Sequence, residues 1–165
     1  MKNFLRKALV VVASFAMVLS SFTFVSVANV VAAEADYEIY PIPQAIEYQD
    51  GKVTLGREVS VFYGESIDTV TRNHVADALG NVNVSATDTA DVKLLVGSVG
   101  ENSAAEAFVN ENGGYSEGLM DKIDAYVIVV KDDTIAVLGK NTDGAFYGIT
   151  TLKHIIKQAE GEIRN

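Results

Sequence analysis

Hydrophobic and polar residues alternate with a period of two on both sides of an Asp-Gly pair in AIEYQDGKVTL, residues 45–55. Such alternation predicts strands with one buried face, and Asp-Gly favours the left-handed backbone of a two-residue turn. A hairpin that turns at Asp50 and Gly51 is therefore predicted. Its register places Tyr48 opposite Val53 and Ile46 opposite Leu55. All four apolar side chains then lie on one face of the hairpin.

Five further strands are predicted from short apolar runs that are bounded by turn-forming residues. They are VSVFY (59–63), a short strand early in NVNVSATDTA (81–90), DVKLLVGSV (91–99) and the two halves of AYVIVVKDDTIAVLGK (125–140). The last two strands are joined at Asp132-Asp133. Both are apolar on both faces, which is typical of central strands covered on two sides.

Apolar residues at helical spacing predict a main helix after residue 66, with Ser66 as its N-cap and Gly80 at its end. Its apolar stripe comprises Ile67, Val70, His74, Ala78 and Leu79. Ser103 and Glu106 form a candidate capping box for a short helix near 104–111.

The order of these elements predicts an α+β fold. We expect a mixed, largely antiparallel sheet with two main helices packed on one face. The second main helix is the last element, from about Gly144 to Gln158. The strand pair before it is antiparallel, which favours α+β over a doubly wound sheet.

The segment DGAFYGITTL, residues 143–152, places two glycines around an aromatic pair where this last helix begins. Glycine inside a helix costs about 1 kcal/mol relative to alanine, so a close approach to a strand or another domain should offset it. An anion site at the helix N-terminus is the alternative, but Asp143, a candidate cap, would repel an anion. We interpret the segment as a packing device. The residues given a structural role are Asp143, Gly144, Ala145, Phe146, Tyr147 and Gly148 here, and Asp50 and Gly51 in the hairpin.

The chain begins with MKNFLRK and a long apolar run that ends in small residues, a pattern that predicts a secretory signal peptide. Cleavage is expected after Ala33, with Ala35 as the alternative. An uncleaved membrane anchor is the competing interpretation, because the run exceeds the roughly 20 residues of a spanning helix. We expect a signal at 1–33, a single domain at 34–165, and a secreted or cell-surface bacterial protein.

Composition restricts the possible partners. The formal charge is −9, and removal of Lys2, Arg6 and Lys7 with the signal changes it by three units to −12. This acidity argues against nucleic acid and against an anionic membrane surface. The chain has no cysteine, which excludes disulfides and thiolate chemistry.

Candidate catalytic residues are few. Asp132-Asp133 resembles an acidic catalytic pair, but its position between two strands favours a turn. His74 and His154 lack metal-binding spacing, and no nucleophile or nucleotide motif is present. We therefore predict no catalytic, substrate-binding or metal residue in this chain, and no cofactor.

The motifs YPIPQAIEYQDGKVTL and NTDGAFYGITTLKHIIK resemble the N-terminal domain of glycoside hydrolase family 84. Those enzymes are secreted bacterial β-N-acetylglucosaminidases, often labelled hyaluronidases, and a similar small domain precedes the barrel of family 20 β-hexosaminidases. The resemblance covers residues 37–165, and DGxFYG…TL is its most specific part.

The resemblance implies a TIM barrel after Asn165, in which one Asp orients the N-acetyl group of the sugar and a neighbouring Asp acts as acid and base. No position here matches that pair. The resemblance thus implies a non-catalytic domain, a fragment inactive alone, whose partners are its own C-terminal barrel and, through the parent enzyme, a glycan. The alternative is a free-standing secreted or surface-tethered binding module for glycan or protein, which would need an exposed aromatic platform.

Overall fold

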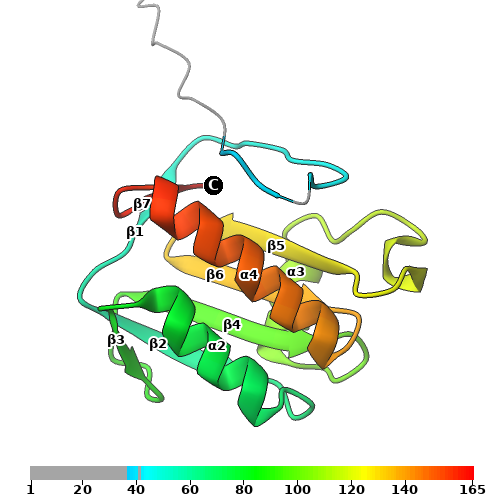
Figure 1. Ribbon diagram of the computed structural model, residues 1–165, viewed down its shortest axis with the longest axis horizontal. Coiled ribbons are helices and arrows are strands. Elements are labelled where there is room, and N and C mark those ends of the chain that lie inside the picture. Colours follow the sequence, from blue (N-terminus) through cyan, green and yellow to red (C-terminus); the bar gives the residue numbers. More distant parts are fainter. Residues whose placement is uncertain (1–36, 41) are drawn as a thin grey trace, which may run out of the picture. The chain divides into compact units, whose positions relative to one another are not determined.

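The computed structural model describes residues 37–40 and 42–165, and its larger sheet has five strands in the order β3-β2-β4-β6-β5 (Figure 1). These strands are β2 (Glu58–Tyr63), β3 (Asn83–Ser85), β4 (Val92–Ser98), β5 (Tyr126–Lys131) and β6 (Thr134–Gly139). β2 is parallel to β3 and β4, and β4 is parallel to β6, whereas β5 and β6 are antiparallel.

Helices α2 (Thr69–Leu79) and α4 (Thr142–Gln158) lie on one face of this sheet, and α3 (Ala104–Glu111) lies on the other (Figure 1). The main core forms beneath α2 and α4 and includes Val75, Ile149 and Leu152, all fully buried. A smaller core forms beneath α3. The predicted α+β class, with two main helices on one face of a mixed sheet, is confirmed. No helix in the described residues is long and apolar enough to cross a membrane.

The direction of the strands differs from the prediction of a largely antiparallel sheet. Three of the four strand pairs in the five-stranded sheet are parallel. Two neighbouring parallel strands must be joined by a crossover connection, which is usually a helix. Helix α2 makes this connection between β2 and β3. The hydrophobic pattern reports which faces are buried and contains no such directional information.

The predicted hairpin at Asp50 and Gly51 is not formed. β1 (Lys52–Thr54) instead pairs antiparallel with β7 (Glu162–Arg164), so that Val53 lies opposite Ile163. Both side chains are almost fully buried. Residues 45–49 form no strand, although Gly51 has the positive φ that a tight turn requires. The final strand of the domain therefore occupies the place that the local pattern assigned to residues 46–48.

The Tyr48 side chain contacts Tyr37 and Arg164 and does not take part in the predicted hairpin. The guanidinium carbon of Arg164, in β7, lies 3.8 Å from the centroid of the Tyr48 ring. The Tyr48 hydroxyl accepts a hydrogen bond from the backbone N–H of Tyr37 at 3.1 Å, and the Tyr37 hydroxyl accepts one from the N–H of Arg164 at 3.1 Å. The Tyr48 ring thus joins the two ends of the domain, and it does not lie opposite Val53.

The strands that flank Asp132-Asp133 form the predicted antiparallel hairpin, with Asp132 in a left-handed conformation (φ 51°). β6 is a central strand and almost wholly buried, as expected. β5 was also predicted to be central, but it is an edge strand of intermediate exposure. Its apolar outer side chains are only partly covered, because an edge strand has a neighbour on one side alone.

Helix α2 begins two residues later than predicted. Its N-cap is Asp68, whose carboxylate accepts a hydrogen bond from the N–H of Thr71 at 2.7 Å and lowers its own pKa through that bond. Ser66 is therefore not the cap. Val70 of the predicted stripe is 65% exposed, because the buried face of α2 is the one that carries Thr71, Val75, Ala78 and Leu79. Gly80 ends the helix, as predicted.

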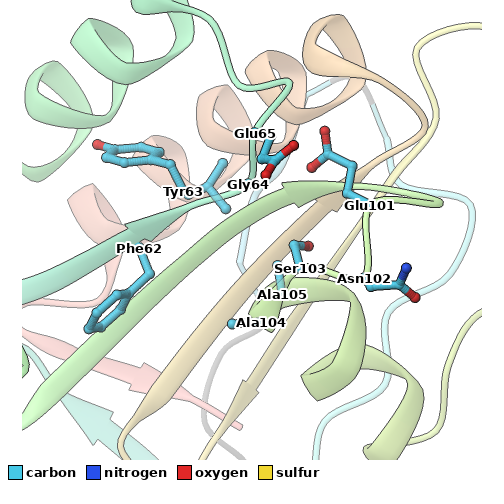
Figure 2. Close-up of a pocket in the computed structure, with 10 residues that line it drawn as sticks. Phe62, Tyr63, Gly64, Glu65, Glu101, Asn102, Ser103, Ala104 and Ala105 are labelled. Atoms are coloured by element: carbon cyan, nitrogen blue, oxygen red, sulfur yellow. The ribbon is translucent and has the colours of Figure 1, made fainter.

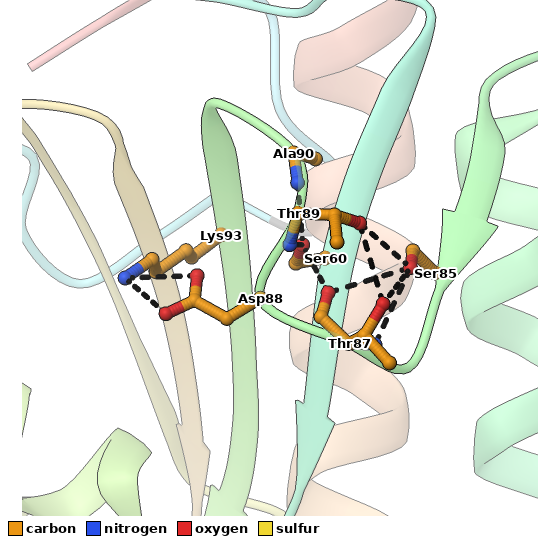
Figure 3. A network of polar contacts seen from close by, with 7 residues as sticks. All are labelled: Ser60, Ser85, Thr87, Asp88, Thr89, Ala90 and Lys93. Atoms are coloured by element: carbon orange, nitrogen blue, oxygen red, sulfur yellow. Dashed lines mark hydrogen bonds and ion pairs between the residues drawn. The ribbon is translucent and has the colours of Figure 1, made fainter.

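A polar network fixes the loop that leads from β3 to β4 (Figure 3). Its centre is Ser60 on β2, which is fully buried. The Ser60 hydroxyl donates to the carbonyl of Thr87 at 2.6 Å and accepts from the N–H groups of Ala90 at 3.0 Å and Thr89 at 3.3 Å. One side chain thereby satisfies three backbone groups of a loop without regular structure.

Ser60→Ala is expected to lower the free energy of unfolding by about 1–3 kcal/mol, because it removes the three hydrogen bonds of a fully buried hydroxyl that joins β2 to this loop. Chemical denaturation measures this loss. Ser85→Ala is the matched control: its hydroxyl belongs to the same network but bonds only exposed groups, so the expected change is within about 0.5 kcal/mol. Equal effects of the two substitutions would contradict the central role of Ser60.

Candidate functional site

A hollow of about 200 Å³ lies at the carboxyl ends of β2 and β4, and we call it the switch-point crevice (Figure 2). Its lining residues are Phe62 to Glu65, Val96 and Glu101 to Ala105. The chain leaves β2 through α2 on one face of the sheet, whereas it leaves β4 through α3 on the other. Ligands of open α/β sheets commonly bind where the connections diverge in this way.

The carboxylate of Glu101 occupies the crevice. It accepts hydrogen bonds from the N–H groups of Ser66 at 2.7 Å and Ser98 at 3.2 Å. A Cβ atom added to Gly64 would collide with Glu101 Oε2, so the carboxylate packs directly on the backbone. Figure 2 shows Glu101 pointing towards the Gly64 loop. The amides that could bind a ligand anion are therefore used by the chain's own carboxylate.

The N-terminus of α3 beside the crevice is also occupied. Ser103 caps it by accepting from the N–H of Glu106 at 3.3 Å, as the predicted capping box requires. The Glu106 carboxylate returns to the N–H groups of Gly100 and Asn102, each at 2.8 Å, and not to that of Ser103. The carboxylates of Glu101 and Glu106 thus accept hydrogen bonds from the backbone N–H groups around the crevice. Through Glu101, they connect the loop after β2 to the loop after β4.

The predicted acidic candidates lie apart on the surface. Asp132 and Asp133 form the exposed β5–β6 turn, Asp50 is exposed in the loop before β1, and Asp143 is exposed in the first turn of α4. Asp143 was the expected cap, but Asn141 takes this role, since its side-chain oxygen accepts from the N–H of Gly144 at 3.0 Å. The crevice does bring Glu65 and Glu101 together, which the sequence did not indicate.

The two histidines are on α2 and α4. His74 stacks on Phe146 with ring centroids 4.2 Å apart, and its Nε2 lies 3.0 Å from Thr150 Oγ1. Partial burial, helped by the charge of Lys153, lowers the pKa of His74. His154 is half-buried. No group of three potential metal ligands exists within residues 37–40 and 42–165.

Gly144 and Gly148 lie where α4 meets the sheet. A Cβ atom on Gly148 would lie 2.5 Å from Val137 Cγ1 of β6, and one on Gly144 would collide with the carbonyl oxygen of Ala125. Ala145 is fully buried between them. Phe146 and Tyr147 face away from this contact, and Tyr147 is 48% exposed. The segment places α4 close to β5 and β6 and presents one aromatic ring outwards.

A second hollow, of about 260 Å³, lies beside Tyr147, and we call it the tyrosine groove. Its lining residues are Tyr40, Asp124, Tyr126, Tyr147, Thr150 and Thr151. The Tyr126 hydroxyl lies 2.7 Å from Thr151 Oγ1, and this contact connects β5 to α4. The groove combines residues from the N-terminal segment, the start of β5 and α4. No local pattern of the sequence indicated this groove, because its tyrosines lie in separate segments of the chain.

Comparison with known proteins identifies the domain. Residues 36–165 match the family described as glycosyl hydrolase family 20, domain 2. The chain belongs to this family. The predicted resemblance to the small domain of family 20 and family 84 glycoside hydrolases is therefore confirmed.

Solved structures agree with the assignment. The one described as "Structure of CpGH84D" has 39% sequence identity and a TM-score of 0.72. The similarity covers 79% of this chain but 23% of that one. "Structure of CpGH84B" has 22% identity and a TM-score of 0.60, covers 73% of this chain and 20% of that one, and shows the shared fold alone. The family 20 domain described here thus spans less than a quarter of the length of either protein.

Proposed function

We propose that this chain is a non-catalytic accessory domain of a secreted glycosidase that releases β-linked N-acetylglucosamine, and that it supports an adjoining TIM barrel. The family match over residues 36–165 carries the proposal. The similarity to less than a quarter of CpGH84D supports it, because a domain of this kind accompanies a much larger part of such a protein.

The acidic residues support a non-catalytic role. Glycoside hydrolysis requires an acid and a second group placed on either side of one sugar linkage. In the switch-point crevice of about 200 Å³, Glu101 is held by two backbone amides and packs on the backbone of Gly64. The other acidic candidates, such as Asp133, are exposed and apart.

Exposed isoleucines favour a domain that packs on another one. Ile42 is 81% exposed and Ile123 is 88% exposed. The two segments that carry them are joined where Lys122 Nζ donates to Gln44 Oε1 at 2.6 Å. An apolar surface patch typically marks a contact with another domain, and we propose that these two side chains contribute to one. In the proposed enzyme, the catalytic barrel covers them.

Export is part of the proposal. It rests on the MKNFLRK start and the apolar run with small residues at its end, which lie outside the described residues. Cleavage after Ala33 leaves the domain in an extracellular or cell-surface location, and the membrane is a partner only if the signal stays uncleaved. A net negative charge and the absence of cysteine suit such an acidic, core-stabilised secreted domain.

Material exported from a bacterium tests both parts. Mass spectrometry is expected to give a chain that begins at Glu34 or Asp36, and this chain should not hydrolyse 4-nitrophenyl N-acetyl-β-D-glucosaminide above the rate in buffer. A fusion that supplies a β-N-acetylglucosaminidase barrel after Asn165 is expected to restore hydrolysis. An intact Met1 on membrane-bound product would contradict export. Turnover by the chain alone, abolished by Glu101→Gln or Asp133→Asn, would contradict the accessory role.

A further inference from the structure

The tyrosine groove is lined by aromatic and polar side chains. Each of its six lining side chains carries a hydroxyl or a carboxylate, and none is aliphatic. Two of its rings are exposed, Tyr40 by 67% and Tyr147 by 48%. A tyrosine presents a flat apolar face together with a polar tip. The groove thus offers ring faces and hydrogen-bonding groups within one small hollow.

The β5 and α4 walls of the groove have partners within the protein. The Tyr147 ring meets Phe146 edge-on, with centroids 5.9 Å apart and planes at 90°. The hydroxyls of Tyr126 and Thr151 lie within hydrogen-bonding distance of each other, and the Thr150 hydroxyl donates to the carbonyl of Phe146 at 3.1 Å. These partners hold the side of the groove formed by β5 and α4 in place, which reduces the entropic cost of binding there.

Charge and shape select the kind of ligand. Asp124 contributes the negative charge of the groove, and the whole chain has a formal charge of −9, so an anionic ligand is disfavoured. A protein segment would find no aliphatic wall, although apolar contacts dominate the centre of protein interfaces. A volume of about 260 Å³ is slightly below the range for drug-sized ligands and suits a single ring.

We propose that the tyrosine groove binds one neutral pyranose ring of a glycan, with Tyr40 and Tyr147 against the ring faces and Asp124 accepting hydrogen bonds from sugar hydroxyls. The apolar C–H face of a pyranose stacks on an aromatic ring, while its hydroxyls need polar partners at the rim. This proposal goes beyond the accessory role, since it assigns a sugar site to this chain itself. Neither proposal depends on the other.

Titration of the purified chain with N,N′-diacetylchitobiose, cellobiose and glucuronic acid, followed by NMR, tests the proposal. We expect saturable shifts of amides around Tyr126 and Tyr147 with at least one neutral disaccharide, at millimolar concentrations, and none with glucuronic acid. Tyr147→Ala is expected to weaken binding by about tenfold or more, because it removes a stacking face. Tyr147→Phe keeps the ring and is expected to bind within about twofold of the parent chain.

Asp124→Asn provides a second variant that retains the fold, because Asn tolerates the left-handed backbone at this position (φ 54°). It is expected to weaken neutral-sugar binding without creating binding of glucuronic acid. Val84→Ala is the matched surface control, since Val84 is 46% exposed on β3 at the far edge of the sheet, and its binding should be unchanged. Absence of saturable shifts with both disaccharides, equal binding by Tyr147→Ala, or shifts explained by self-association of the chain would overturn the proposal.

Discussion

Gly148→Leu is expected to lower the free energy of unfolding by about 3 kcal/mol, since a Cβ atom at this position would already lie 2.5 Å from Val137 Cγ1. Replacing a helical glycine would by itself stabilise α4 by up to about 1 kcal/mol. A net loss therefore means that the close contact outweighs helix propensity. For a domain of this size, the loss corresponds to a decrease in Tm of roughly 10 °C, measurable by differential scanning calorimetry.

Tyr147→Leu is the matched control, because it introduces the same side chain at the next position of α4, where the native ring is 48% exposed. Its Tm is expected to change by only about 1–2 °C. An unchanged Tm for Gly148→Leu, together with a loss of sugar binding, would contradict the packing role. In that case the segment would act as a ligand-binding loop.

Ile163→Ala is expected to lower the free energy of unfolding by about 2–5 kcal/mol. Ile163 in β7 is 1% exposed and lies opposite Val53 in β1, so its truncation leaves a cavity between the two strands. Denaturant unfolding measures the loss. A double-mutant cycle with Val53→Ala should give a coupling energy of about 0.5–3 kcal/mol, as expected for side chains in contact.

Ile46→Ala distinguishes the β1–β7 pairing from the predicted hairpin of residues 45–55. The hairpin would place Ile46 on the same face as Val53, whereas the structure leaves Ile46 outside any strand and 47% exposed. Its truncation is expected to change stability by no more than about 0.5 kcal/mol. A large effect of Ile46→Ala with a small effect of Ile163→Ala would show that the hairpin is the true arrangement.

Short-range signals in the sequence determined most elements. Asp132-Asp133 marks the β5–β6 turn, Gly80 ends α2, and Ser103 begins α3 at Ala104, as predicted. Each depends on the backbone conformation of a few consecutive residues, and such preferences act independently of the rest of the chain. The DGAFYG motif likewise indicated the glycoside hydrolase family from the sequence alone.

Long-range choices were visible only in the tertiary structure. The parallel direction of β2, β3, β4 and β6, the pairing of Val53 with Ile163, and the edge position of β5 all depend on segments far apart in the chain. The hydrogen bond from Ser66 to Glu101 and the tyrosine groove likewise bring together segments that are far apart in the chain. An alternating pattern indicates that one face of a strand is buried, but several other strands or helices of the chain could cover that face. The competition between them is decided by the total apolar area and hydrogen bonding of the whole domain, which no local window of sequence contains.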